Sequence, residues 1–166
     1  MAVRFTCGDE AEAVDIMREA ARWLGDIGRP MWDEKDLTVE NLQNSGGEFW
    51  VMWDGTKSVA AMMMHFEDRF FWPGVEQGTS GFIHKLSVRR EYASKGYARM
   101  MVEHARKRCT GKGLSFLMLD CDPHRSGLMR FYVSCGFELL EIKSMNTKKI
   151  GQIDLAMFEM KIGPNY

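Results

Sequence analysis

The segment from Leu86 to Arg108 holds the residues of this 166-residue sequence that are best placed to do chemistry. It reads LSVRREYASKGYARMMVEHARKR, which predicts a strand ending at Val88, a short connection, and a helix beginning at Gly96. The first turn of a helix combines backbone N–H groups that lack intrahelical acceptors with the positive end of the helix dipole, and both favour a bound pyrophosphate. Gly96 lets the backbone approach phosphate without an intervening Cβ, and the small Ala98 preserves that approach. An ordinary strand–turn–helix connection explains the same residues equally well, because glycine turns are common.

Other arrangements that could carry chemistry are weaker. The phosphate-binding patterns GxxxxGK[ST] and GxGxxG are both absent. The spacing of His65, His104 and His124 is not that of metal ligands, so no metal site is expected. Cys121 is a conceivable acyl-accepting nucleophile, although a packed thiol at the end of a strand is the favoured interpretation.

The elements that must position this segment follow from hydrophobic periodicity. Apolar residues at three- and four-residue steps indicate amphipathic helices, and Asp54-Gly55 between two apolar runs indicates a β-hairpin. Helices first, then an antiparallel meander, then alternating strands and helices predict a mixed α/β or α+β domain. The expected helices cover residues 9–24, a short stretch after 38, 96–109 and 126–135, and the expected strands cover 48–53, 58–68, about 81–88, 114–121, 137–142 and 153–162.

Two of these segments together resemble a known family. Leu86-Ser87-Val88, seven residues and then Gly96-Tyr97-Ala98 resemble motif A of the GNAT superfamily of N-acetyltransferases, Arg/Gln-x-x-Gly-x-Gly/Ala, which opens the helix under the CoA pyrophosphate. Downstream, FYVSCGF at 131–137 resembles the motif B signature, aromatic-Tyr-x-x-x-Gly-Phe. Two motifs at the expected separation are more specific than either alone, so the sequence is identified as a member of this superfamily.

The resemblance implies a fold, a cofactor and a set of binding positions. The fold is a GNAT-like mixed sheet of about six to seven strands with flanking helices and a splayed central strand pair, formed by residues 1–166 as a single acetyltransferase domain. The cofactor is acetyl-CoA. The implied cofactor-binding residues are Leu86, Val88, Ser94, Lys95, Gly96, Tyr97, Ala98, Arg99, Arg125 and Tyr132.

The sequence departs from the family pattern at two positions. Ala93 stands where the family usually has Arg or Gln, which should weaken pyrophosphate binding more than abolish it, because the family grips pyrophosphate mainly through backbone amides. Arg125 stands where Asn is frequent, seven residues before the motif B tyrosine. A cation there can still pair with a phosphate or cap nearby carbonyl groups.

The resemblance also suggests catalytic roles. Tyr132 matches the family tyrosine that protonates the departing sulfur, although its spacing also fits a packed aromatic residue. His84 is the candidate general base, since a histidine four residues before the strand-ending valine relays the amine's proton in arylalkylamine-type members; a buried core histidine is the alternative. Regular alternation would place Phe82, His84, Leu86 and Val88 on one face of their strand. Met31-Trp32 and the loop at 70–73 are where the family builds its acceptor pocket, and both could wall an apolar or cationic amine.

Composition limits the remaining functions. Lys and Arg number 22 and Asp and Glu 23, so overall charge does not favour nucleic acid or an anionic membrane. Four scattered cysteines and no apolar leader predict a cytoplasmic protein. The main prediction is therefore an N-acetyltransferase acting on a primary amine of a small molecule or peptide, with a homodimer compatible with the family. The alternatives are a catalytically silent acyl-CoA sensor or scaffold, which Ala93 and Arg125 favour, and a nucleic-acid-associated regulator, which the charge disfavours.

Overall fold

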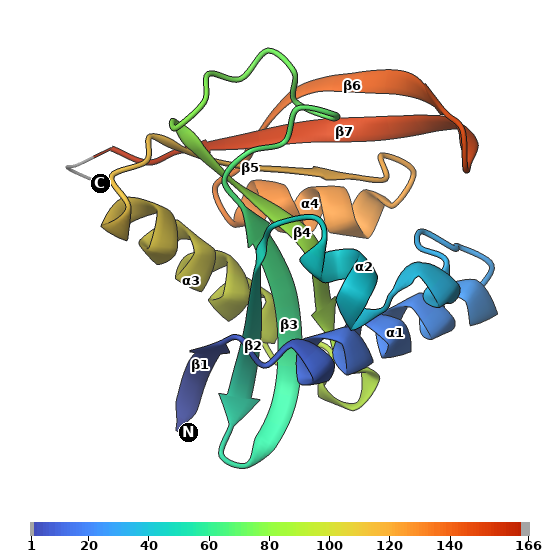
Figure 1. Cartoon of the computed structure of the whole chain (residues 1–166), viewed down its shortest axis with the longest axis vertical. Coiled ribbons are helices and arrows are strands. Elements are labelled where there is room, and N and C mark those ends of the chain that lie inside the picture. The colour runs from blue at the N-terminus through green and yellow to red at the C-terminus, as the bar shows by residue number, and fades with distance from the viewer. Residues whose placement is uncertain (1, 164–166) are drawn as a thin grey trace. The chain divides into compact units, whose positions relative to one another are not determined.

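A computed structural model describes residues 2–163 as a seven-stranded mixed sheet with flanking helices (Figure 1). The strand order is β1-β2-β3-β4-β5-β7-β6, which confirms the α/β fold class expected from the sequence. The chain forms two compact units, one with residues up to Phe66 and Ile83–Ala105, the other with Glu67–Phe82 and the chain from Arg106 onward. The elements are β1 (Val3–Cys7), α1 (Glu10–Asp26), the 3-10 turn η1 (Glu34–Asp36), α2 (Val39–Gln43), β2 (Glu48–Asp54), β3 (Lys57–His65), β4 (Ser80–Val88), the 3-10 turn η2 (Arg90–Tyr92), α3 (Tyr97–Gly111), β5 (Phe116–Cys121), α4 (Ser126–Ser134), β6 (Glu138–Thr147) and β7 (Gly151–Lys161).

In the first unit, α1 and α3 pack against opposite faces of the antiparallel strands β1, β2 and β3. Alternate residues of a strand point to opposite faces. Phe49 and Val51 of β2 belong to the buried cluster around α1, whereas Trp50 contacts His104 of α3, with ring centroids 4.4 Å apart. His104 also stacks on Phe5 of β1 at 4.1 Å. Both faces of this part of the sheet are therefore covered, and the start of α3 is fixed against it.

The hairpin between β2 and β3 is confirmed at the predicted place. Asp54 pairs with Lys57, and Gly55 has φ 59° in the left-handed region that glycine adopts readily. Strand β1 was not predicted, because five residues with charged and polar members do not show a clear alternation. Helix α3 continues two residues beyond its expected end at 109, through Gly111, and Gly113 after it takes the left-handed φ of 71°.

In the second unit, β5 and β7 are covered on one face by the loop between β3 and β4 and on the other by α4. Trp72 of the loop packs with Phe82, Met118 and Met157. On the opposite face, the ring of Tyr132 of α4 lies 5.9 Å from that of Phe158, the residue after Met157. Strand β5 is accordingly buried over its middle, as its continuous apolar run predicts.

The parallel ladder between β4 and β5 is short. It joins Ser80, Gly81 and Phe82 to Phe116, Leu117 and Met118, and thus uses only the first three of the nine residues of β4. The splayed central pair expected from the sequence stays a prediction.

Candidate active site

The turn between β4 and α3 has an unusual backbone. Ser94 has φ 62° and Gly96 has φ 85°, so two of the three residues before the helix are left-handed. This region is strained for most L-residues and easy for glycine. Ser94, Lys95 and Gly96 are exposed, and a Cβ placed on Gly96 would meet no atom within 4 Å. Glycine is thus required here by its backbone conformation, and the space beside it is open.

The turn is anchored at its beginning by Arg89. The Arg89 guanidinium is largely buried, with 14% of its side chain exposed. It lies 2.9 Å from carboxylate oxygens of both Glu12 and Asp15 of α1, and its Nε donates to the carbonyl of Ser58 at 3.0 Å. The next residue adds to this anchor, because the backbone N–H of Arg90 donates to Glu19 at 3.0 Å. The chain leaving β4 is therefore tied to α1 before the turn begins.

The end of the turn is anchored by Tyr97. Its hydroxyl donates to a carboxylate oxygen of Asp54 at 2.5 Å, and only 4% of the residue is exposed. Tyr97 is also among the residues expected to bind the cofactor, which stays a prediction; its side chain holds the start of α3 to the β2–β3 hairpin. Arg89 and Asp54 were missed by the sequence analysis, since nothing in their sequence neighbourhood marks a contact with residues so far along the chain.

The geometry at the start of α3 suits an anion. The carbonyl of Gly96 accepts the first helical hydrogen bond, from the N–H of Met100 at 3.2 Å, so the helix begins immediately after the turn. The first-turn N–H groups of such a helix point outward along its axis with the positive end of the dipole. Lys95 and Arg99 are exposed beside them, and Ala98 is half-buried. A fixed, open turn with backbone donors and two cations is a good binding site for phosphate oxygens.

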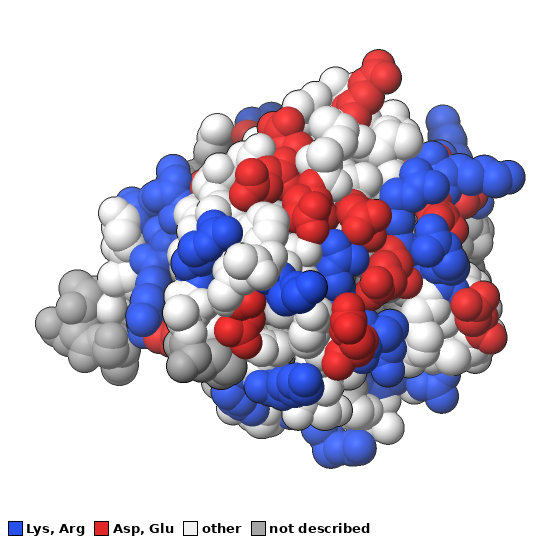
Figure 2. Space-filling view, turned by 90° about the horizontal axis from the view of Figure 1, so that it is seen from below, with Lys and Arg blue, Asp and Glu red and all other residues white. Residues whose placement is uncertain are grey.

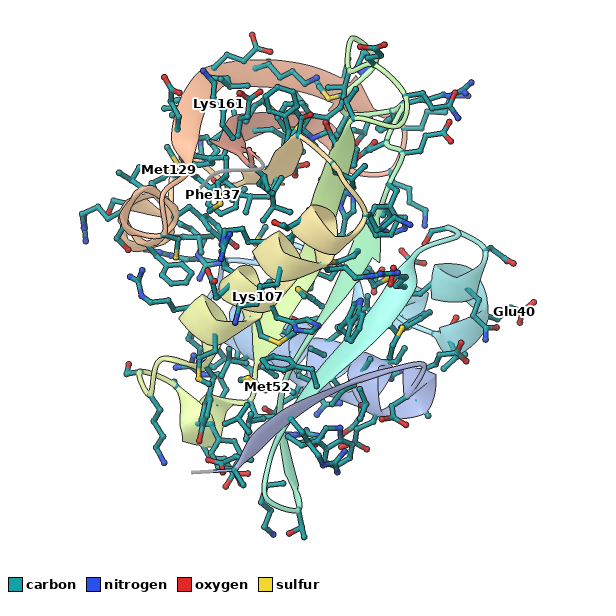
Figure 3. All side chains as sticks on the ribbon, turned by 90° about the vertical axis from the view of Figure 1, so that its left-hand side faces the viewer. Glu40, Met52, Lys107, Met129, Phe137 and Lys161 are labelled. Carbon is teal, nitrogen blue, oxygen red and sulfur yellow. The ribbon has the colours of Figure 1, made fainter. Side chains whose placement is uncertain are left out.

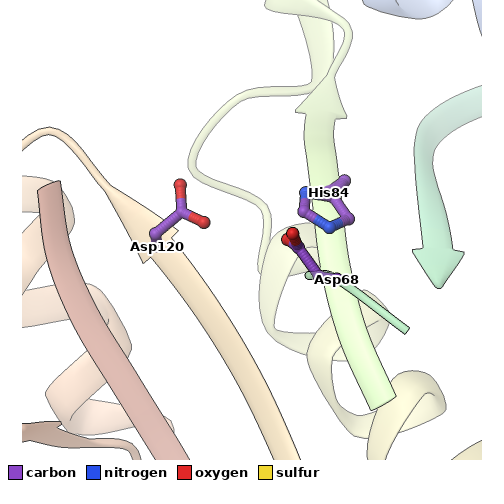
Figure 4. A group of neighbouring side chains, drawn as sticks. All are labelled: Asp68, His84 and Asp120. Carbon is purple, nitrogen blue, oxygen red and sulfur yellow. The ribbon is translucent and has the colours of Figure 1, made fainter. Parts of the chain in front are cut away.

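His84 lies on β4, half-buried, in the first unit (Figure 4). The next residue, Lys85, has φ 55°, which interrupts the regular alternation of the strand. Beyond it, Ser87 is buried while Leu86 and Val88 are half-buried. The observed backbone therefore does not place the residues before Lys85 and those after it on one face of the strand.

One contact of His84 comes from the end of the neighbouring hairpin strand. Its ring lies edge-on to that of His65 of β3, with centroids 4.7 Å apart and an interplanar angle of 83°. The ammonium group of Lys85 lies 5.3 Å from the ring centroid of Trp32, within the range of a cation–π contact. Trp32 thus lies near β4. In the loop at 70–73, the other segment expected to line the acceptor pocket, Trp72 is a core residue, whereas Phe70 is 61% exposed.

Tyr132 lies on α4 in the second unit and is buried, with 7% exposed. Its ring contacts Phe137 at 5.8 Å, and Met129 on the same helix approaches the Sγ of Cys121 with its Sδ at 3.7 Å (Figure 3). Within residues 2–163 the structure assigns no hydrogen-bond partner to the Tyr132 hydroxyl. The ring is therefore held by packing, while the hydroxyl is not committed to another group of the described chain.

Burial governs the acidity of the groups around Tyr132. It raises the pKa of the Tyr132 hydroxyl well above its usual value, with a further contribution from the Cys121 thiol. Burial also raises the pKa of Cys121 to about 12, and Asp120, beside it on β5 (Figure 4), acts in the same direction. Since the thiolate is the reactive form, Cys121 is a poor nucleophile at neutral pH. Arg125, half-buried immediately before α4, acts in the opposite direction on both groups.

Comparison with protein families identifies the chain. A family model described as "Acetyltransferase (GNAT) family" matches residues 17–137, which include β4, the turn at Gly96, α3 and the FYVSCGF segment. The chain belongs to the GNAT acetyltransferase family. The matched range spans both units, and the residues on which the resemblance rests all lie within it.

Solved structures of acetyltransferases share the fold of this GNAT chain at low sequence identity. The ribosomal-protein-S18-alanine N-acetyltransferase of Escherichia coli has a TM-score of 0.70 at 18% identity, covering 99% of each chain. The Salmonella typhimurium protein yncA, solved with its cofactor acetyl-CoA, has a TM-score of 0.71 at 13% identity, covering 98% of this chain and 95% of its own. An acetyltransferase of Bacillus subtilis in complex with CoA has a TM-score of 0.68 at 16% identity, covering 98% and 100%. Comparison with curated protein sequences finds no match.

Two surface properties of this GNAT protein bear on its partners. Within the described residues, no helix is both long and apolar enough to cross a membrane. On the face shown in Figure 2, Lys and Arg side chains are interspersed with Asp and Glu, in keeping with a formal net charge of −1. That face is therefore neither uniformly basic nor uniformly acidic.

Proposed function

We propose that this GNAT protein transfers an acetyl group from acetyl-CoA to a primary amine of a small molecule or peptide. The observation that carries the proposal is the open turn at Ser94–Gly96, which is anchored at both ends and followed at once by α3. Family membership supplies the reaction class. Acetyl-CoA supplies the acetyl group in activated form, as a thioester.

The residues of the turn fit the pyrophosphate of CoA. Gly96 has open space beside it, the backbone donors of α3 begin there, and Lys95 and Arg99 are exposed cations. Ala93 contributes no side-chain donor, so backbone amides would carry most of the binding. Three similar structures were solved with acetyl-CoA or CoA, which supports the same cofactor here.

We assign the two proton-handling roles to His84 and Tyr132. The amine nitrogen attacks the thioester carbonyl, the new C–N bond forms, and the C–S bond breaks. Before this attack, His84 accepts the extra proton of the ammonium form of the acceptor. The proton that the nitrogen loses as the amide forms is the one that the departing thiolate takes up, so that the products are an amide and the free thiol of CoA. An ordinary thiol has a pKa of about 8.5, below the raised pKa of Tyr132, so the Tyr132 hydroxyl acts mainly as a hydrogen-bond donor to the developing thiolate.

A catalytically silent acyl-CoA sensor is the second candidate. Ala93 and Arg125 favour it, because both depart from the pattern of the family motifs. The geometry of the turn is the same in either case, since binding without transfer needs the same pyrophosphate site.

An assay of CoA thiol release with a panel of amines separates the two candidates. An enzyme releases thiol in an amine-dependent manner, whereas a sensor binds acetyl-CoA without turnover. Binding is measured in parallel as a rise in melting temperature with acetyl-CoA concentration, because a ligand that binds only the folded state stabilises it. Absence of any shift at millimolar acetyl-CoA would contradict both candidates.

Gly96→Val is expected to weaken acetyl-CoA binding by about 10- to 100-fold, the equivalent of one or two lost charge-assisted hydrogen bonds. A branched side chain would fill the open space beside the turn, and the φ of 85° would strain it. The measurement is the dissociation constant by calorimetry.

The matched control is Gly28→Val, because Gly28 has a similar φ of 75° with nothing within 4 Å of an added Cβ. It carries a comparable backbone strain after α1 and should leave the dissociation constant unchanged. If the folded Gly96→Val protein binds acetyl-CoA with an unchanged dissociation constant, the turn is an ordinary connection and not a pyrophosphate site.

Three further features belong to the same proposal. Residues 1–166 act as a single acetyltransferase domain, since the family match runs through both units. Within the described residues, Cys7, Cys109, Cys121 and Cys135 are not joined by disulfide bonds, which supports a reducing compartment such as the cytoplasm. A homodimer is compatible with the family.

A further inference from the structure

We propose that His65, held by Ser45 and given room by Gly47, is a positioning residue that orients the imidazole of His84. The inference rests on the proposed function in one respect: the orientation of His84 matters because His84 is the proposed base. All four residues lie in the first unit, on the α2–β2 connection, at the end of β3 and on β4.

The hydrogen bond between Ser45 and His65 has a defined direction. The Ser45 hydroxyl donates its single proton to the carbonyl of Leu42 at 2.6 Å. The same oxygen lies 2.9 Å from Nε2 of His65, and it has no second proton to give. With the hydroxyl proton directed to Leu42, the Ser45 oxygen is left to accept from Nε2, and this bond restrains the rotation of the His65 ring.

The backbone of Gly47 lies directly against the ring of His65. A Cβ at residue 47 would lie 2.6 Å from Nε2, 2.7 Å from Cε1 and 3.0 Å from Cδ2 of His65, closer than real Cβ contacts allow. The φ of Gly47 is not in the left-handed region, so backbone conformation does not require glycine here. Space for the His65 ring is the physical reason that the structure offers for glycine at this position.

The fixed ring in turn packs against the candidate base. The edge-on arrangement of His65 and His84, at 4.7 Å and 83°, is a favoured geometry for two aromatic rings. Because the Ser45 bond and the Gly47 backbone hold His65 from one side, His65 presents His84 with a rigid surface on the other. A base must lie within hydrogen-bond reach of its proton, and a misplacement of about 1 Å can cost roughly 100-fold in rate, so a packed partner of this kind matters for transfer.

A double-mutant cycle tests the inference. Gly47→Ala pushes the ring away from its place and should lower kcat by roughly 10- to 100-fold, with KM for acetyl-CoA unchanged. In a His65→Ala background the clash no longer exists, so Gly47→Ala should have no further effect on kcat. Gly25→Ala is the matched control, since an added Cβ there meets no atom within 4 Å and no left-handed φ is involved; it should behave as the wild type.

Ring NMR signals provide a readout that does not depend on activity. The chain has four histidines, so 15N-labelled imidazoles can be assigned individually. Both Gly47→Ala and Ser45→Ala should shift the ring resonances of His84, and Ser45→Ala should change the tautomer populations of His65; Gly25→Ala should do neither.

Each outcome has one interpretation. If Gly47→Ala lowers kcat equally in the wild type and in His65→Ala, the inference is wrong. It is also wrong if the ring resonances of His84 move in neither Gly47→Ala nor Ser45→Ala. If the wild type transfers acetyl to no amine, the proposed function fails, and the NMR result alone then decides whether His65 orients His84.

Discussion

Tyr132→Phe is expected to lower kcat by about 10²–10³-fold, the range for a lost hydrogen bond to charge that develops in the transition state, with little change in KM for acetyl-CoA. The ring of Tyr132 is held by Phe137 and Phe158, and these contacts do not involve the hydroxyl. Its hydrogen bond to the leaving sulfur would exist mainly in the transition state, so the loss should appear in kcat. Steady-state kinetics with saturating amine measure it.

Stability separates this role from ordinary packing. Since the structure assigns the hydroxyl no partner within residues 2–163, Tyr132→Phe should change the free energy of unfolding by less than about 1 kcal/mol. A fully active Tyr132→Phe enzyme would end the proposed role of Tyr132 and leave the cofactor assignment intact. A silent acyl-CoA sensor would show no turnover in either form and equal affinity for acetyl-CoA.

His84→Gln is expected to lower kcat by about 10²–10⁴-fold near neutral pH, because glutamine cannot accept the amine's proton. The direction of the pH dependence follows from the substrate. As the pH rises toward the pKa of the amine, a larger fraction of the acceptor is already neutral and needs no base before attack. The ratio of wild-type to variant rates should therefore shrink with increasing pH, which a pH–rate profile of both proteins measures.

His124→Gln is the matched control for this substitution. His124 is 74% exposed by its side chain, and its Nε2 lies 3.2 Å from a carboxylate oxygen of Asp154 in the second unit. The same change of residue type there should leave kcat and its pH profile as in the wild type. A rate ratio for His84→Gln that is constant across pH would contradict the role of a base and favour a packing role for His84.

The elements that carry the candidate site could be predicted because their signals are local. The hairpin at Asp54-Gly55 depends on a left-handed glycine between two apolar runs, and it appears where expected. The start of α3 follows from Gly96 and from the periodicity after it. The boundaries differ by a few residues, as with β3, which ends at His65 although its apolar run suggests Asp68. The ends of helices and strands depend on tertiary hydrogen bonds, which hydrophobic periodicity does not report.

The sequence by itself thus determined the fold class, the family and the turn before α3, because these depend on residue types at short, fixed spacings. Only the tertiary structure decided what holds that turn and the candidate base in place. Arg89 reaches Glu12 and Asp15 more than seventy positions away, and Gly47 makes room for His65 across a strand pair. Such contacts depend on strand order, register and the left-handed residue Lys85 within β4. Register is set by the packing of the whole sheet, so a single sequence does not reveal which distant side chains it brings together.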